Sequence, residues 1–170
     1  LNYALNKDAI LKLIGGEYAG KVSTTITAKT VPGFQPYDAY PAPATGDVAK
    51  AKELLKGATP TIKLCYRPGT PLREQVAATY KEALERAGFQ IVLSPTDATS
   101  HYTLIGNKVY ANTNPGCDLL TGGWGQDYPS NSTVMGVLMK GGGAIHAEGN
   151  NNWSYLDVPE LNTKLDTLLS

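Results

Sequence analysis

Residues 61 to 94 place a long amphipathic segment between two short apolar runs, and this pattern restricts the fold more than any other part of the sequence. The runs TIKLCY (61–66) and FQIVLS (89–94) have the β-branched and apolar composition of strands. Between them, apolar residues recur with helical spacing from Leu72 to Ala87, and Gly88 follows as a helix stop. A strand, a helix and a second strand in this order predict two parallel strands joined by a helical crossover.

Other segments extend this pattern on both sides. The chain is 42% hydrophobic over 170 residues, which is enough for one packed domain, and we predict a single domain over residues 1–170. Its predicted class is α/β, with a small and mainly parallel sheet flanked by helices. We predict further helices at residues 2–14, 47–57 (capped by Asp47), 132–140 and from Asp157 and Pro159 onward, and a third strand that begins at Cys117.

Charge and hydropathy exclude several classes of partner. Fifteen basic and fifteen acidic residues cancel, so no net field favours nucleic acid or anionic lipid, and we expect no nucleic-acid partner. No apolar run approaches the roughly 20 residues of a spanning helix, and no signal segment opens the chain. The chain begins with Leu1 in what looks like the middle of a helix, so we expect it to be a piece of a longer protein.

The cysteines and histidines give little support for catalysis or metal binding. Cys65 and Cys117 could form one disulfide or remain separate thiols. Because Cys65 falls late in one predicted strand and Cys117 at the start of another, we favour two buried thiols that lie too far apart to be bridged. His101 and His146 are too few for a metal site and are interpreted as surface residues. No nucleophile has a base at a recognisable spacing. We therefore predict no cofactor, no metal and no enzymatic activity.

The stretch GGWGQDYPSNST (122–133) contains one carboxylate, Asp127, in an uncharged neighbourhood. It leaves the third predicted strand at its carboxyl end, where open α/β sheets bind ligands. Because no Lys or Arg occurs from Asn112 to Met139, a ligand ammonium is a suitable partner for Asp127. Trp124 and Tyr128 would supply flat walls beside it. The alternative is that Asp127 caps the turn that follows it.

Residues 22 to 46 form a second region of interest. They carry Pro32, Pro36, Pro41 and Pro43 among glycines and aromatic residues, with neither a helical nor a strand period. The sequence predicts a long ordered loop, and long loops of this kind tend to be functional.

Several segments, in order along the chain, resemble the family 5 extracellular solute-binding proteins, which are peptide-binding receptors of ATP-binding-cassette (ABC) importers. They are LNYALNKDAI, VPGFQPYDAY, AKAKELLKGA, ALERAGFQIVL, CDLLTGGWGQDYPSNST and GNNNWSYLDVPELNTKLD. The resemblance runs along essentially all residues and corresponds to the larger, carboxy-terminal lobe of the type II periplasmic-binding fold. It implies that the amino-terminal lobe, the signal and lipidation segment and the closing helices belong to other parts of the protein.

The resemblance also implies a function and a set of site residues. Such a receptor closes two lobes on a peptide and delivers it to a membrane permease, without covalent chemistry, as an extracytoplasmic or lipid-anchored protein. The aspartate of the family's W-x-x-D segment meets the ligand's α-ammonium, which by position is Asp127, with Trp124 as the tryptophan and Tyr128 next to it. The loop around Phe34, Gln35 and Tyr37 resembles a segment that reaches the cleft. The backbone near Gly122 and Gly123 would pair with an extended peptide.

Two alternative functions remain open at this stage. One is an oligosaccharide receptor of the same family, in which Trp124, Tyr128 and amide side chains hold the ligand and Asp127 need not be charged. The other is a ligand-sensing domain of a regulator. The run GNNNWSY (149–155) either lines the cleft or forms a hydrogen-bonded surface loop.

Overall fold

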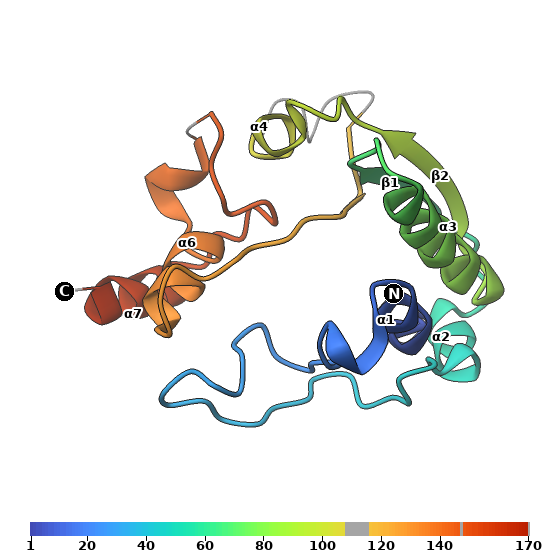
Figure 1. Ribbon diagram of the computed structural model, residues 1–170, viewed down its shortest axis with the longest axis horizontal. Helices are drawn as coiled ribbons and strands as arrows, with labels where there is room; N and C mark the ends of the chain where they lie inside the picture. The colour runs from blue at the N-terminus through green and yellow to red at the C-terminus, as the bar shows by residue number, and fades with distance from the viewer. Residues whose placement is uncertain (108–115, 147, 170) are drawn as a thin grey trace. The chain divides into compact units, whose positions relative to one another are not determined.

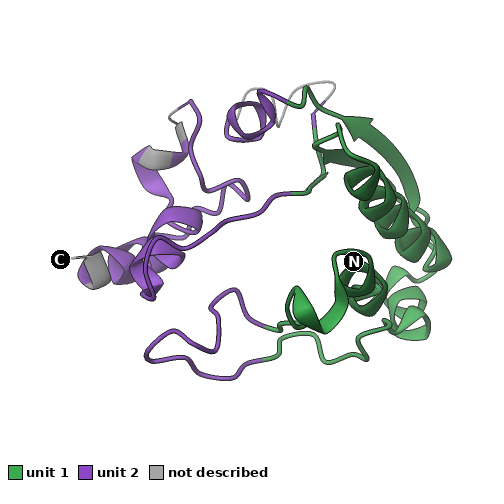
Figure 2. Ribbon diagram, in the orientation of Figure 1, with its two compact units in different colours: residues 1–24, 38–98, 117–121 green, residues 25–37, 99–116, 122–170 purple. Residues whose placement is uncertain are grey.

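The computed structural model describes residues 1–107, 116–146 and 148–169. Residues cluster into two compact units, which Figure 2 shows in green and purple. Unit 1 comprises residues 1–24, 38–98 and 117–121. Unit 2 comprises residues 25–37, 99–116 and 122–170. The prediction of a single domain stays a prediction, and each unit is described here by itself.

Unit 1 contains the predicted parallel sheet. Strands β1 (Thr61–Tyr66), β2 (Gln90–Pro95) and β3 (Leu119–Leu120) lie in the order β2-β1-β3, and both pairs are parallel. In the central strand, Leu64 pairs with Leu93 on one side and with Leu119 on the other. The first two strands match their predicted positions within a residue, whereas the third is shorter than the run CDLLTGG indicates.

The helices of unit 1 begin at residues whose side chains cap them. They are α1 (Lys7–Leu13), α2 (Val48–Leu55) and α3 (Pro71–Arg86), and a short 3-10 helix, η1 (Gly16–Tyr18), follows α1 (Figure 1). The Asp47 carboxylate accepts a hydrogen bond from the Lys50 amide, which confirms the predicted cap of α2. Helix α1 is shorter than predicted because Asn6 caps it, through a 3.0 Å bond from the Ala9 amide to Asn6 Oδ1.

The core of unit 1 lies where the helices cover the sheet. Its buried members come from the start of the chain, α2, β1, the end of α3 and β2: Ala4, Ala51, Leu64, Leu84, Ala87, Phe89 and Ile91. Burial of one such large side chain contributes about 1.5–3 kcal/mol. Because these residues come from five successive segments, the core joins the elements that the strand–helix–strand pattern predicts.

A disulfide joins Cys65 of β1 to Cys117, with their Cα atoms 5.7 Å apart. The prediction of two separate thiols is therefore wrong. It assumed that Cys117 opens the third strand and that the parallel register fixes its position. In the structure that strand begins only at Leu119, so Cys117 lies outside the ladder and its distance from Cys65 is set by the loop that leads into β3.

Unit 2 consists of short helices and ordered loops. Its elements are α4 (His101–Ile105), η2 (Asn131–Thr133), α6 (Met135–Leu138), η3 (Gly142–His146) and α7 (Pro159–Leu169). The helix predicted over residues 132–140 is broken into η2 and α6, because Ser130 caps a 3-10 turn and Val134 separates the two with φ −111°. Pro159 opens α7 as predicted.

His101 corrects a second prediction, because it is buried at 1% exposure rather than lying on the surface. It begins α4, and its ring packs edge-on to Tyr102 with the centroids 5.0 Å apart. The side chain of His146, which was also interpreted as a surface residue, lies outside the described side chains.

Asn152 organises the loop that precedes α7. It is 2% exposed, and its amide donates to the carbonyls of Lys140 and Leu156 at 3.0 and 2.8 Å. Its oxygen accepts from the Ser154 hydroxyl and the Leu156 amide. Tyr155 ties the same loop to α4 by donating its hydroxyl to the Ile105 carbonyl at 2.7 Å. At Asn152 and Tyr155, the run GNNNWSY is therefore a hydrogen-bonded loop.

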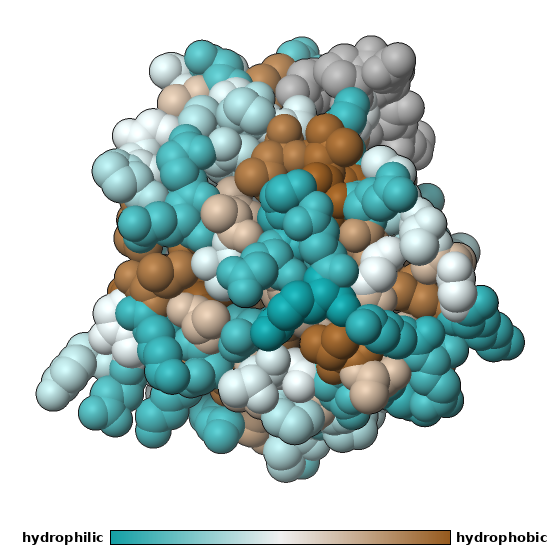
Figure 3. Space-filling view, turned by 90° about the vertical axis from the view of Figure 1, so that its right-hand side faces the viewer, coloured by the Kyte–Doolittle hydropathy of each residue, from teal (hydrophilic) through white to brown (hydrophobic). Residues whose placement is uncertain are grey.

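The surface that Figure 3 shows is mixed, with apolar areas separated by polar side chains. Exposed apolar residues of unit 1 include Leu54, Leu72 and Val92. None of the described helices combines the length and the apolar composition needed to span a membrane. Residues 22–46, predicted as a long loop, contain neither helix nor strand.

Candidate functional site

The segment Gly122–Thr133 leaves β3 and belongs to unit 2. From Gly122 to Asp127 the chain has neither helix nor strand, and its backbone makes no hydrogen bond with any residue that the structure describes. The last ladder-like bond is the one from the Thr121 amide to the Cys65 carbonyl at 3.0 Å. Directly after the sheet, the chain therefore presents a row of backbone donors and acceptors that are available to a ligand.

Asp127 lies at the end of this row, and its side chain is exposed. Within the described residues it makes neither a hydrogen bond nor an ion pair. The next cationic residue along the chain, Lys140, is paired with Asp166. The protein therefore leaves the Asp127 charge available to a cation from outside. Exposure also means that the carboxylate remains hydrated until a ligand covers it, which differs from the partly buried group that the sequence suggested.

The turn after Asp127 is held by hydroxyl groups. The Ser130 hydroxyl caps this turn by accepting a hydrogen bond from the Ser132 amide at 3.3 Å. The hydroxyl oxygens of Ser130 and Ser132 lie 2.9 Å apart. The Thr133 hydroxyl donates to the carbonyls of Tyr128 and Ser130. The alternative role of Asp127, as the cap of this turn, is therefore filled by Ser130. The hydroxyl-rich sequence of residues 130–133 thus builds a hydrogen-bonded turn that begins three residues after Asp127.

Trp124 is fixed by one hydrogen bond and one ring contact. Its indole N–H donates to the Thr133 carbonyl at 2.8 Å. Its ring meets Trp153 edge-on, with centroids 6.4 Å apart and planes at 70°. Trp124 nevertheless stays 36% exposed and Tyr128 57% exposed, so both rings offer apolar surface within three residues of Asp127 in the sequence.

Trp153 adds a second indole ring next to Trp124. It is half-buried, and its ring lies 5.3 Å from the ring of Tyr102, which is 41% exposed. We call Trp124, Trp153 and Tyr102 the aromatic row. Gly122 makes room for it, since a Cβ at that position would lie 2.7 Å from Trp153 Cζ3.

The sequence suggests Trp153 only as one member of an amide-rich run, and it misses Tyr102. No helical or strand period connects residue 102 to residues 124 and 153, so the row follows from tertiary packing alone. The structure thus adds Tyr102 to the candidate site and brings the Trp153 ring beside that of Trp124, while the cleft-lining role of the run GNNNWSY stays a prediction.

The other residues predicted for the site are Phe34, Gln35, Tyr37 and Gly123. Phe34 is half-buried and donates its amide to the Val31 carbonyl, whereas Gln35 and Tyr37 are exposed. The hydrogen bonds and ring contacts of the described residues link neither Phe34 nor Gln35 to the segment from Trp124 to Asp127. A Cβ at Gly123 would meet open space. The roles of these four residues stay predictions.

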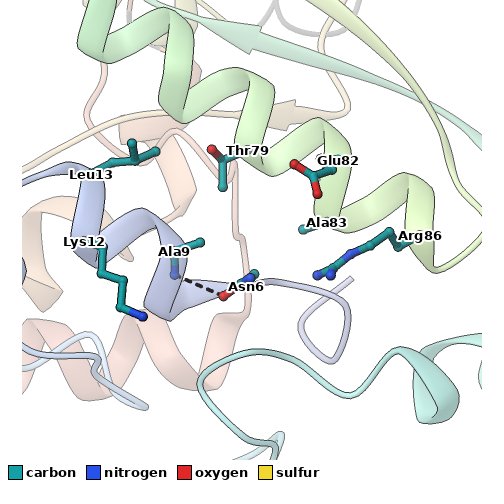
Figure 4. A pocket seen from close by; sticks show the side chains of 8 residues that line it. All are labelled: Asn6, Ala9, Lys12, Leu13, Thr79, Glu82, Ala83 and Arg86. Carbon is teal, nitrogen blue, oxygen red and sulfur yellow. Dashed lines mark hydrogen bonds between the residues drawn. The ribbon is translucent and has the colours of Figure 1, made fainter.

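A separate open groove of about 400 Å³ lies in unit 1 between α1 and α3. Figure 4 shows its lining of small and charged side chains, which are Asn6, Ala9, Lys12, Leu13, Thr79, Glu82, Ala83 and Arg86. The groove follows the second half of α3, which returns the chain to the amino-terminal end of the sheet. Ligands of such sheets bind at the opposite, carboxyl ends of the strands, so this groove is the weaker candidate.

The described residues contain no group of three or more His, Cys, Asp or Glu side chains that could hold a metal ion. The predictions that the protein needs no metal and no cofactor stay predictions.

Solved structures confirm the predicted fold class, a type II periplasmic-binding-protein-like lobe with a small parallel sheet flanked by helices. The clavulanic acid biosynthesis oligopeptide binding protein 2 is 26% identical, with a TM-score of 0.86 over 99% of this chain. DppA from Helicobacter pylori, solved in complex with peptide STSA, is 20% identical with a TM-score of 0.71 over 98% of this chain. AppA from Bacillus subtilis, solved in complex with a nonapeptide, is 14% identical with a TM-score of 0.69 over 97% of this chain.

The chain spans about a third of the length of these proteins, with coverage of 32%, 30% and 33% in the same order. No curated protein sequence matches it. The family model described as bacterial extracellular solute-binding proteins, family 5 middle, matches residues 1–145, which is most of the chain. On this match, the chain belongs to the family 5 bacterial extracellular solute-binding proteins.

Proposed function

We propose that this chain forms the part of an extracytoplasmic receptor that binds the amino terminus of a peptide, which the receptor delivers to the permease of an ABC importer. The observation that carries the proposal is the state of Asp127, an exposed carboxylate that no described residue neutralises. A peptide's α-ammonium supplies the missing charge. A hydrogen bond between charged groups contributes about 1.5–3 kcal/mol, which favours a free amino terminus over a blocked one.

The backbone that precedes Asp127 favours a peptide over other ligands that carry an ammonium group. An extended peptide that lies along Gly122–Gln126 can exchange main-chain hydrogen bonds with the unpaired donors and acceptors there. Such bonds do not depend on side chains, so they suit a receptor that accepts many sequences. DppA from Helicobacter pylori and AppA from Bacillus subtilis, which share the fold, were each solved with a bound peptide.

The disulfide supports the proposed location. Cysteine pairs persist in oxidising compartments such as the periplasm and the cell surface, and are rare where thiols are kept reduced. Cys65 and Cys117 are bonded, and no other cysteine is present in the sequence. We infer an extracytoplasmic protein, held either in the periplasm or on the cell surface as a lipoprotein, whose second lobe is supplied by the rest of the same protein.

The test is the affinity of the complete receptor for peptides after the change Asp127→Asn. We expect a loss of about 10-fold to 150-fold, which corresponds to one charge-assisted hydrogen bond. Glu148→Gln is the matched control, because Glu148 is also an exposed carboxylate of unit 2 for which no described partner exists. Acetylation of the peptide's amino terminus should weaken binding to the unaltered receptor by a similar factor. Unchanged affinity after both changes would remove the proposed role of Asp127.

An oligosaccharide receptor is the second candidate, and the aromatic row favours it, because sugar rings stack on exposed indole and phenol faces. Such a ligand carries no ammonium. Tight binding of a neutral oligosaccharide that is insensitive to Asp127→Asn would therefore support this candidate. A ligand-sensing domain of a regulator is the third, and a DNA-binding segment encoded next to this chain would favour it.

A further inference from the structure

Helix α1 carries an apolar stripe that the described residues of unit 1 do not bury. Ile10 and Leu11 follow Lys7 by three and four residues, and Ile14, at the end of the helix, follows it by seven. Residues with this spacing lie along one face of a helix. No residue of α1 is buried, and Ile14 is 46% exposed. We call Ile10, Leu11 and Ile14 the α1 stripe.

The α1 stripe lines an open cavity of about 290 Å³. The rest of the lining comes from the start of α1, Leu5, residues 21–23 and Tyr80 of α3, so the whole cavity belongs to unit 1. Leu5 and Tyr80 also pack against the core of unit 1. The apolar part of the lining consists of Leu5, Ile10, Leu11, Ile14 and Val22. A mainly apolar cavity with a few polar groups is typical of sites for small molecules, and this cavity lies at the lower end of their range of volumes.

The charged groups of this cavity are cationic. Its described lining contains Lys7 and Lys21 and neither Asp nor Glu. Neither lysine side chain forms an ion pair or a hydrogen bond with any residue in the described ranges. The groove between α1 and α3 differs, because its lining includes Glu82 (Figure 4) and because its Lys12 is paired with Asp8. The cavity beside the α1 stripe therefore favours an anionic ligand, and the groove does not.

Tyr80 adds a neutral hydrogen-bond donor to the two lysines. Its side chain is half-buried, and its hydroxyl forms no hydrogen bond with any part of the chain that the structure describes. Burial raises the pKa of Tyr80, so the hydroxyl keeps its proton at neutral pH. An acceptor oxygen of a ligand in the cavity would satisfy this donor, and a carboxylate oxygen is a stronger acceptor than a neutral one.

The volume limits the size of the ligand. A molecule of liquid water occupies about 30 Å³, so a cavity of about 290 Å³ holds roughly ten non-hydrogen atoms. An aliphatic acid with a chain of about eight carbons has this size, and its chain matches the excess of apolar over charged residues in the lining.

We propose that the cavity beside the α1 stripe binds a small amphipathic carboxylate, with its aliphatic chain against the stripe and its carboxylate held by Lys7, Lys21 and the Tyr80 hydroxyl. The bound chain would cover apolar surface that the described residues leave exposed to water. The inference goes beyond the proposed function and does not depend on it, because the segment from Gly122 to Asp127 contributes no residue to this cavity.

The first test is calorimetry on the complete receptor with hexanoate, octanoate, decanoate and octanol. For a ligand of octanoate's size we expect a Kd on the order of 0.1–1 mM. One buried methylene group changes affinity by about fourfold, so hexanoate should bind about fivefold to 15-fold more weakly. Decanoate should gain less than about twofold over octanoate, because the cavity is then full. Octanol, which lacks the charge, should bind at least about fivefold more weakly than octanoate.

The second test removes the polar groups of the cavity. The double change Lys7→Gln and Lys21→Gln should weaken octanoate by at least about fivefold and leave octanol unchanged. Lys52→Gln with Lys56→Gln is the matched control, because these exposed lysines of unit 1 do not line the cavity and have no described partner. Tyr80→Phe keeps the ring and should weaken octanoate by about threefold to tenfold.

Three results would overturn the inference. The first is octanoate that fails to bind at about 10 mM, tenfold above the weakest expected Kd, or that binds no better than octanol. The second is octanoate affinity that the changes at Lys7 and Lys21 leave intact. The third is sedimentation with phosphatidylglycerol vesicles that needs both lysines and that octanoate does not compete for, which would assign the cavity to a lipid surface. Octanoate affinity that is unchanged in Asp127→Asn and at saturating peptide would support a site separate from the proposed peptide site, whatever the outcome of the peptide experiments.

Discussion

Removal of the Cys65–Cys117 disulfide should destabilise unit 1 by about 4 kcal/mol. The two cysteines are separated by 52 residues, and the cross-link prevents the unfolded chain from opening a loop of that size. Loop-closure entropy assigns about 3 kcal/mol to a 15-residue loop and about 4.7 to a 100-residue loop, so a value near 4 applies here. The double change Cys65→Ala and Cys117→Ala removes the bond and leaves only a small void at Cys65, which is 1% exposed.

Thermal unfolding followed by far-ultraviolet circular dichroism measures the effect. For a protein of this size, 1 kcal/mol shifts Tm by about 2–4 °C, so we expect a decrease of about 8–16 °C in the double variant. Circular dichroism is the suitable signal because it includes the helices of unit 1, whereas both tryptophans, Trp124 and Trp153, lie in unit 2. The single variant Cys117→Ala should lose as much stability as the double variant.

Two results would refute this reasoning. One is a decrease of less than about 3 °C in the double variant, which corresponds to less than about 1 kcal/mol. The other is an unaltered protein whose Tm stays the same after unfolding and refolding in reductant. Either would mean that the unfolded chain is already compact around the loop, so that the cross-link removes little entropy.

The remaining predictions concern packing, hydrogen bonds and pH. Asn152→Leu should cost about 2–4 kcal/mol, measured by denaturant unfolding, because it removes the four hydrogen bonds of a side chain that is 2% exposed. Gly122→Ala should displace the Trp153 ring, which near-ultraviolet circular dichroism detects, since the new Cβ would lie 2.7 Å from it. Tyr66 donates its hydroxyl to Glu74 at 2.5 Å, and this hydrogen bond, with burial, raises the pKa of Tyr66. Because the pKa of Tyr66 is higher in the folded state than in the unfolded state, its contribution to stability is present below about pH 10 and is lost as the pH rises through the folded value. Above about pH 10, the denaturant midpoint of Tyr66→Phe should therefore fall less steeply with pH than that of the unaltered protein.

The parts of the fold that the sequence predicts are those set by local chemistry. The run TIKLCY, the amphipathic segment from Leu72 to Ala87 and the cap at Asp47 each depend on neighbours within a few residues, and all three are present in the structure. Parallel pairing follows from their order, because a helix between two strands leaves few other arrangements.

The errors lie where position depends on distant residues. The pairing of Cys65 with Cys117 depends on the path of a loop before β3, which no period in the sequence specifies. His101 begins α4, which lies in a segment with weak patterning, so the sequence did not indicate that its side chain is buried. The interruption at Val134 separates two short helices within a stretch whose composition suits one.

In the candidate site, too, local features can be predicted from the sequence and contacts between distant segments cannot. Asp127 can be found from the sequence because its significance comes from a local absence, the lack of any nearby basic residue between Asn112 and Met139. The aromatic row cannot, because its contacts join α4, the segment after β3 and the loop before α7. Gly122 shows the difference most clearly. The sequence suggests that the backbone there is open to a ligand, and the structure adds that the Trp153 ring fits only because Gly122 has no side chain. The proposed anchor at Asp127 therefore rests on a local pattern of charge that the sequence reveals, whereas the position of the Trp153 ring rests on packing that only the structure reveals.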